Sequence, residues 1–100
     1  MEVSGNSLTS LAPVANLESL IELWAGEGLN GAGNNYQDLE PVSRLAKLRD
    51  LDITGSKVSN VAPLARMESL RRLFIKHTAI GDLSPLDELI KKNRLIVFKG

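Results

Sequence analysis

The sequence contains no cysteine and few aromatic residues. Its 100 residues include one histidine, His77, and four aromatic side chains within an apolar content of 43%. Without cysteine, the chain can form neither disulfides nor cysteine-ligated zinc sites, and a single histidine has no second histidine with which to share a metal. We therefore predict no metal and no cofactor, and a core built from aliphatic side chains.

Neither sign of charge predominates, and no apolar stretch is long. The chain carries twelve basic and twelve acidic residues. Nucleic acids and anionic membranes attract a local excess of positive charge, so we expect neither as the main partner. The start, MEVSGNSLTS, lacks the basic and apolar regions of a signal peptide, and no apolar run is long enough to span a membrane. These absences predict a cytoplasmic location.

The four prolines reveal an internal repeat. Intervals of 28, 22 and 22 residues separate Pro13, Pro41, Pro63 and Pro85. In this phase the apolar columns recur in four segments, and the column expected to anchor the strands reads Leu23, Leu51, Leu73 and Leu95. The repeat predicts one domain over residues 1–100, with a partial unit at 1–7 and units near 8–35, 36–57, 58–79 and 80–100.

The apolar period changes within each unit. After the proline, apolar side chains recur at every third position, as in a short helix or 3-10 turn, at Leu64, Met67 and Leu70. The pattern then alternates, with Leu73 and Ile75 inward and Phe74 outward, as in a strand. Proline suits a first helical turn, and Ser84 is expected to cap the last helix. Each unit is thus a strand plus a short helical turn, which buries its apolar side only by stacking.

These residues resemble the leucine-rich-repeat family in its 22-residue class. The segments LRRLFIKHTAI and LRDLDITGSKV fit the pattern LxxLxLxxNxL, with Thr78 and Ser56 where the family prefers asparagine. The segments LAPVANLESL and VAPLARMESL look most like the repeats of bacterial internalins. The resemblance implies an α/β fold, a right-handed solenoid with parallel strands on the concave face and short helical or 3-10 turns on the convex face. It also implies a partner-binding role, although the family binds many unrelated partners.

Outward positions of stacked parallel strands form rows across the sheet. The first predicted row reads Glu22, Asp50, Arg72 and Arg94. The middle row reads Trp24, Asp52, Phe74 and Ile96. The third row reads Gly26, Thr54, Lys76 and Phe98. Acidic residues gather on the first two strands and basic residues on the last two, so the rows predict a dipolar face with three outward aromatic residues.

This face is the predicted binding site for another protein, because exposed aromatic residues beside arginine are typical anchors of interfaces. The predicted contact residues are Glu22, Trp24, Asp50, Asp52, Thr54, Arg72, Phe74, Lys76, Arg94, Ile96 and Phe98. The alternative is structural: opposite charges pair across the strands, and the terminal aromatic residues cover the ends of the stack.

Two further functions stay open. The C-terminal segment RLIVFKG is an apolar edge strand, which could pair with a second copy in a homodimer.

The loop at 26–33 contains the dinucleotide-binding pattern Gly26-x-Gly28-x-x-Gly31. With Pro41 close behind, no long helix can begin there to receive a pyrophosphate, so we expect an inserted loop. His77 follows a strand and is expected to be an exposed turn residue rather than a general base. The chain is not expected to be an enzyme.

Overall fold

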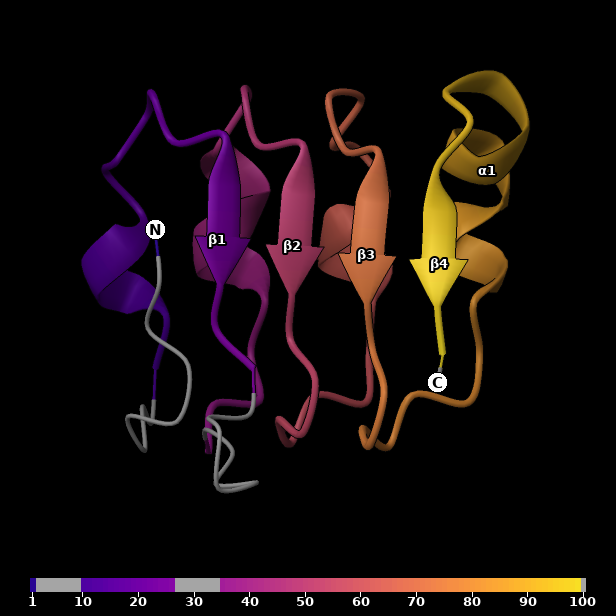
Figure 1. Cartoon of the computed structure of the whole chain (residues 1–100), viewed down its shortest axis with the longest axis horizontal. Helices are drawn as coiled ribbons and strands as arrows, with labels where there is room; N and C mark the ends of the chain where they lie inside the picture. The colour runs from indigo at the N-terminus through magenta and orange to yellow at the C-terminus, as the bar shows by residue number, and fades with distance from the viewer. Residues whose placement is uncertain (2–9, 27–34, 100) are drawn as a thin grey trace.

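The computed structural model describes residues 1, 10–26 and 35–99. Within them, four strands of three residues each form one parallel sheet in the order β1-β2-β3-β4. The strands are β1 (Glu22–Trp24), β2 (Asp50–Asp52), β3 (Arg72–Phe74) and β4 (Ile96–Phe98). They lie side by side in chain order, with the helical segments in a second layer behind them (Figure 1). This arrangement confirms the predicted leucine-rich-repeat solenoid.

A short helical segment precedes each strand, as the apolar period predicted. The segments are η1 (Ala12–Val14), η2 (Glu40–Arg44), η3 (Ala62–Leu64), η4 (Ser84–Leu86) and α1 (Asp87–Lys92). Each of the four 3-10 segments has its proline in the first or second position. None of these described segments is long and apolar enough to cross a membrane.

The helical segments start with a cap that the sequence analysis missed. The predicted cap by Ser84 is wrong, because no side-chain cap bond forms there. Instead, a polar side chain two residues before the segment accepts the first backbone N–H at 2.9–3.0 Å in every unit. These caps form the aligned column Ser10, Asp38, Asn60 and Asp82. Asp82 accepts hydrogen bonds from both the backbone N–H and the hydroxyl of Ser84, and these two bonds lower the pKa of the Asp82 carboxyl.

The core between the two layers is aliphatic, as predicted. Leu23, Leu51 and Leu73 lie at the centres of three adjacent strands and are fully buried. Tyr36 is the one buried aromatic residue among those described, and its hydroxyl donates to the carbonyl oxygen of Ala25 at 2.7 Å. Burial raises the pKa of this hydroxyl far above its ordinary range.

The turns after β2 and β3 each supply a hydrogen bond to the backbone carbonyl oxygen that follows the strand. The Thr78 hydroxyl donates to the Ile75 carbonyl oxygen at 2.6 Å, and the Ser56 backbone N–H donates to Ile53 at 3.1 Å. These residues hold the position at which the family prefers asparagine. Gly55 and His77 each lie one residue earlier, at equivalent places in the two repeats, with φ angles of 75° and 58°. The turn therefore requires a left-handed residue in both repeats.

The fourth unit departs from the predicted register. In the sheet, Ile96 pairs with Arg72, Val97 with Leu73, and Phe98 with Phe74. Val97 therefore holds the anchoring column that was predicted for Leu95, and each outward residue of β4 lies one row before its predicted row. The cause is α1, a six-residue α-helix that follows η4 and delays the strand by two residues.

Met1 extends the sheet beyond β1. Its amino group donates to the Glu22 carbonyl oxygen at 2.7 Å, and its own carbonyl accepts the Trp24 N–H at 2.8 Å. These two bonds place Met1 beside Leu23, the residue 22 positions later, as a neighbouring parallel strand would. The rest of the predicted partial unit, residues 2–7, lies outside the described residues.

Candidate partner-binding face

Three aromatic side chains form a continuous row on the solvent side of the sheet. The ring centroids of Phe74 and Phe98 lie 4.4 Å apart with the planes nearly parallel, at 9°. Those of Trp24 and Phe74 lie 5.7 Å apart at 52°. Trp24 and Phe74 are half-buried, and Phe98 is 40% exposed. We call Trp24, Phe74 and Phe98 the aromatic row.

The aromatic row closes over β2 because the side chain of Asp52 turns away. Trp24 and Phe74 are on strands separated by β2, and such strands lie about 9–10 Å apart. Asp52 stands between them in the register, but its Oδ1 accepts the Thr54 backbone N–H at 2.9 Å. A Cβ on Gly26 would come within 2.8 Å of this oxygen. Gly26 thus leaves room for Asp52 to fold back along the sheet, and the two rings can meet above it.

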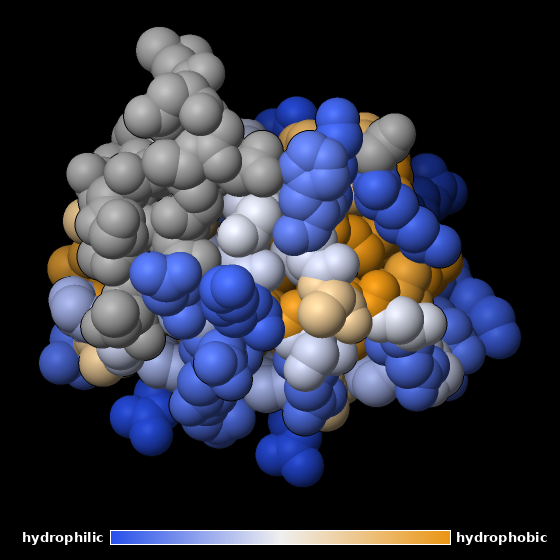
Figure 2. All heavy atoms as spheres, turned by 90° about the horizontal axis from the view of Figure 1, so that it is seen from below, coloured by the Kyte–Doolittle hydropathy of each residue, from blue (hydrophilic) through white to orange (hydrophobic). Residues whose placement is uncertain are grey.

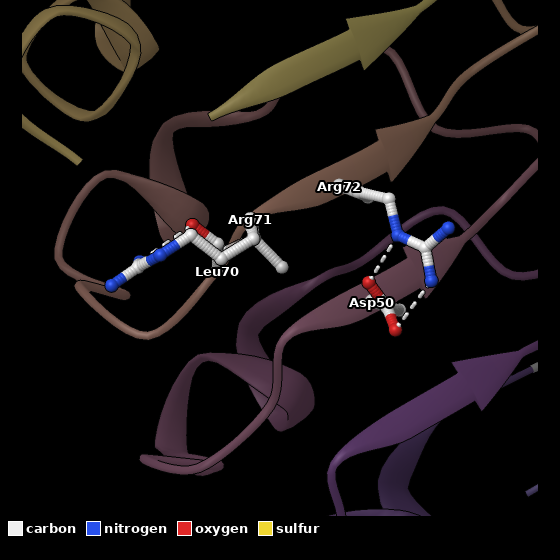
Figure 3. A network of polar contacts seen from close by, with 4 residues as sticks. All are labelled: Asp50, Leu70, Arg71 and Arg72. Carbon is white, nitrogen blue, oxygen red and sulfur yellow. Dashed lines mark hydrogen bonds and ion pairs between the residues drawn. The ribbon is translucent and has the colours of Figure 1, made fainter. Parts of the chain in front are cut away.

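A charged pair lies beside the aromatic row. Arg72 donates from Nε to Oδ1 of Asp50 at 2.7 Å and from Nη2 to Oδ2 at 2.9 Å. Figure 3 shows the guanidinium reaching from β3 across to the carboxylate on β2. Asp50 is buried, whereas the side chain of Arg72 is 47% exposed. The guanidinium holds the pKa of Asp50 below its usual range, and in turn the carboxylate raises the pKa of Arg72.

This pair changes the predicted dipolar face. Because Arg72 neutralises Asp50, the two charges in the first row cancel instead of standing at opposite ends. Arg72 also leans toward β2, and Ile96, its neighbour on β4, is 54% exposed. Figure 2, which views the carboxyl ends of the strands, shows apolar surface toward the β4 side of the molecule. On the sheet face, the most exposed apolar side chains of the strands are therefore those of β4, Ile96 and Phe98.

The structure brings together most, but not all, of the predicted contact residues. The residues on the solvent side of the four strands are Glu22, Trp24, Asp50, Asp52, Arg72, Phe74, Ile96 and Phe98. Thr54 and Lys76 follow directly after β2 and β3. Arg94 was placed in the first row wrongly. It lies in the turn between α1 and β4, with a φ of 56°, because the longer helix shifts the strand.

The other candidate sites find little support in the described residues. Of the loop predicted at 26–33, only Gly26 is described, and it is buried against Asp52; Gly28 and Gly31 lie outside the described residues. His77 is exposed in the turn after β3, as expected. Among the described residues, no group of three or more histidine and carboxylate side chains could hold a metal ion.

Comparison with known proteins gives matches among solved structures. No family model matches the chain, and no curated protein matches it. An internalin (inlF) of Listeria monocytogenes has 34% sequence identity and a TM-score of 0.75, over 92% of this chain and 25% of that chain. Internalin C2 (inlC2) of the same organism has 33% identity and a TM-score of 0.72, over 92% of this chain and 37% of that chain.

The similarity concerns the repeat region rather than the whole of those proteins. The chain spans 25% and 37% of the lengths of the two internalins that it matches. Within that span, sequence identity and backbone geometry agree with the parallel strands, the 3-10 turns and the 22-residue spacing. The chain is a leucine-rich-repeat protein of the 22-residue, internalin-like class.

Proposed function

We propose that this chain is a protein–protein interaction module that holds its partner on the concave sheet face. The observation that supports this most is the aromatic row, which exposes Trp24, Phe74 and Phe98 to solvent although the fold has an aliphatic core to receive apolar side chains. Large aromatic side chains at an interface supply much of its binding free energy, because each buries a wide apolar area.

The aromatic row is already ordered before a partner arrives. Phe74 is held between Trp24 and Phe98, so its ring loses little conformational entropy on binding. The bidentate bond to Asp50 likewise fixes the guanidinium of Arg72 beside the row. A partner therefore meets a preformed surface, in which apolar contacts supply affinity and Glu22, Arg72 and Lys76 set its orientation.

A pull-down with variants tests this function. We expect the double variant Trp24→Ala/Phe74→Ala to lose the partners that the wild-type chain recovers, and Phe98→Ala, at an exposed site, to weaken their capture. The matched control is Arg44→Ala/Arg66→Ala on the exposed convex side. Circular dichroism confirms that each variant is folded. Recovery of the same partners by the wild type and all aromatic variants would show that the concave face is not the binding site.

A second candidate function is self-assembly through β4. This strand is last in the sheet order, and Ile96 and Phe98 on it are 54% and 40% exposed. A second copy that paired with the edge would bury both side chains in a homodimer. Size-exclusion chromatography with light scattering separates the two functions, since a strict monomer at high concentration excludes the homodimer.

The proposed role needs neither an enzymatic activity nor a cofactor. In dinucleotide-binding folds a carboxylate about 20 residues after the glycine pattern binds the ribose. Asp50 and Asp52 lie at about that distance here, but Asp50 is engaged by Arg72 and Asp52 by the Thr54 backbone N–H. Calorimetric titration with NAD and with ATP tests the nucleotide-binding alternative. Heat of binding with either nucleotide would support that alternative. The cytoplasmic location stays a prediction, and fractionation of cells that express the native protein would test it.

A further inference from the structure

A groove at the amino ends of the strands carries three cationic side chains. The groove has a volume of about 640 Å³ and lies away from the aromatic row. Its lining residues are Ile21, Ala46, Lys47, Arg49, Ser69 and Arg71. We call it the basic groove. Among the residues that the structure describes, no carboxylate lines it, although acidic and basic residues balance over the whole chain.

The backbone holds the central column of the basic groove together. Ile21, Arg49 and Arg71 come directly before β1, β2 and β3. The Arg49 N–H donates to the Ile21 carbonyl oxygen at 2.7 Å, and the Arg71 N–H donates to Arg49 at 2.8 Å. The two arginines are therefore neighbours on adjacent strands, an arrangement of like charges that opposes folding. An anion between them would remove that repulsion.

Arg71 is fixed in place but keeps free donors. Its Nη1 donates to the carbonyl oxygens of Glu68 at 2.6 Å and Leu70 at 3.2 Å. Figure 3 shows Arg71 and Arg72 directed to opposite sides, so that Arg71 points away from the ion pair with Asp50. Since a guanidinium has five N–H donors, two carbonyl contacts leave donors for a carboxylate. Its orientation is set before any ligand binds.

We propose that the basic groove binds an acidic peptide segment of a partner protein. Carboxylates of the segment bind Lys47, Arg49 and Arg71, and an aliphatic side chain packs on Ile21, which is 50% exposed at the side of the groove nearest β1. A peptide fits better than a nucleic acid, because the groove combines three cations with the apolar Ile21 and Ala46. Nucleic acid requires a longer cationic track than this neutral chain offers. The proposal is independent of the concave face.

Fluorescence anisotropy with a labelled peptide of alternating leucine and glutamate pairs tests this proposal. The wild-type chain should bind the peptide, with an affinity that falls as salt is raised. The variant Lys47→Gln/Arg49→Gln should bind at least tenfold more weakly; Arg71 is left intact because its carbonyl contacts support the turn. The charge-matched control Lys57→Gln/Lys91→Gln, at exposed positions elsewhere, should bind like the wild type. Thermal unfolding confirms that all are folded.

Three results would overturn the proposal. The first is that the wild-type chain binds the peptide no more tightly than Lys47→Gln/Arg49→Gln does, or not at all. The second is an equal loss of peptide affinity in the control variant Lys57→Gln/Lys91→Gln, which would show that net charge, and not the basic groove, determines the binding. The third is tighter binding of an oligothymidylate than of the peptide, which would assign the groove to nucleic acid. Because these variants leave the aromatic row intact, their pull-downs should still recover concave-face partners, and failure of either proposal can be recognised separately.

Discussion

Trp24 and Phe74 meet across an intervening strand, with ring centroids 5.7 Å apart. Their contact depends on Asp52, whose carboxylate accepts the Thr54 N–H and thereby leaves the space above β2 to the two rings. A polar residue in the middle of an apolar row thus makes the row continuous. The binding face is assembled by this arrangement, and not only by the presence of three aromatic side chains.

Replacing Asp52 with leucine should therefore separate the two rings. The branched apolar side chain cannot bond to Thr54, so it should stand up between Trp24 and Phe74. Loss of the hydrogen bond should also cost about 1 kcal/mol of unfolding free energy. Trp24 is the only tryptophan, so near-ultraviolet circular dichroism and tryptophan fluorescence report the change directly. Asp52→Asn, which keeps an acceptor oxygen, is the control; spectra of Asp52→Leu identical to wild type would contradict this account.

The Asp50–Arg72 pair should make stability depend on acidic pH. Because the pKa of Asp50 is lower in the folded chain than in the unfolded chain, the pair stabilises the fold above about pH 4. This stabilisation is lost as the pH falls through the folded pKa. Urea unfolding across this range should give a steeper fall for wild type than for Asp50→Asn. Asp82, whose pKa is also lowered, gives a comparison at an exposed cap through Asp82→Asn. Equal slopes for wild type and Asp50→Asn would show that the pair contributes nothing.

The centre of the core should be the most sensitive position to truncation. Leu51 is fully buried in β2, between Leu23 and Leu73. Leu51→Ala should lower the unfolding free energy by about 2–5 kcal/mol, since it removes apolar contacts and leaves a cavity. Chemical denaturation measures the loss, with Lys57→Ala at an exposed site as the control. A loss below about 1 kcal/mol would mean that the stacked column is not the main source of stability.

The left-handed turn after the strands should respond oppositely to two substitutions. Gly55→Ala places a Cβ at a φ of 75° and should cost about 1 kcal/mol. His77→Gly, with a φ of 58° at the equivalent place, should leave stability unchanged or raise it by up to about 1 kcal/mol. Thermal unfolding of both variants measures the contrast. The same sign of change in both would show that backbone strain does not decide the residue in this turn.

Repetition explains how much of this structure could be predicted from the sequence. The strands β1, β2 and β3 follow from columns that recur with the same spacing, so their order, their direction and the outward residues of their first two rows were predicted correctly. The third row was predicted less well, because Gly26 is buried and the strands end before this row. The fourth unit was misplaced because Leu95 fits the 22-residue spacing and is buried, yet the anchoring position belongs to Val97. The choice between a 3-10 turn and the longer α1 depends on packing, which spacing alone does not reveal.

The sequence predicted which residues share a row on the sheet face, but it did not predict which side chains contact one another. The register placed Asp50 beside Arg72, and the structure shows that the two neutralise each other. The direction in which a flexible arginine side chain points depends on whether its carboxylate partner is buried. Burial follows from the packing of the folded chain and cannot be read directly from the sequence. The capping residues, which include Asp38 and Asp82, could have been predicted from the sequence, because a polar residue recurs two positions before each 3-10 segment.

The most direct test of the central claim is site-specific photo-cross-linking on the two faces. A benzophenone amino acid is placed at Phe74, in the aromatic row, and separately at Arg66, on the convex side. If the concave sheet face binds the partner, the Phe74 position should cross-link to the protein recovered with the wild-type chain, and the Arg66 position should not. Cross-linking from Arg66 alone would contradict the account.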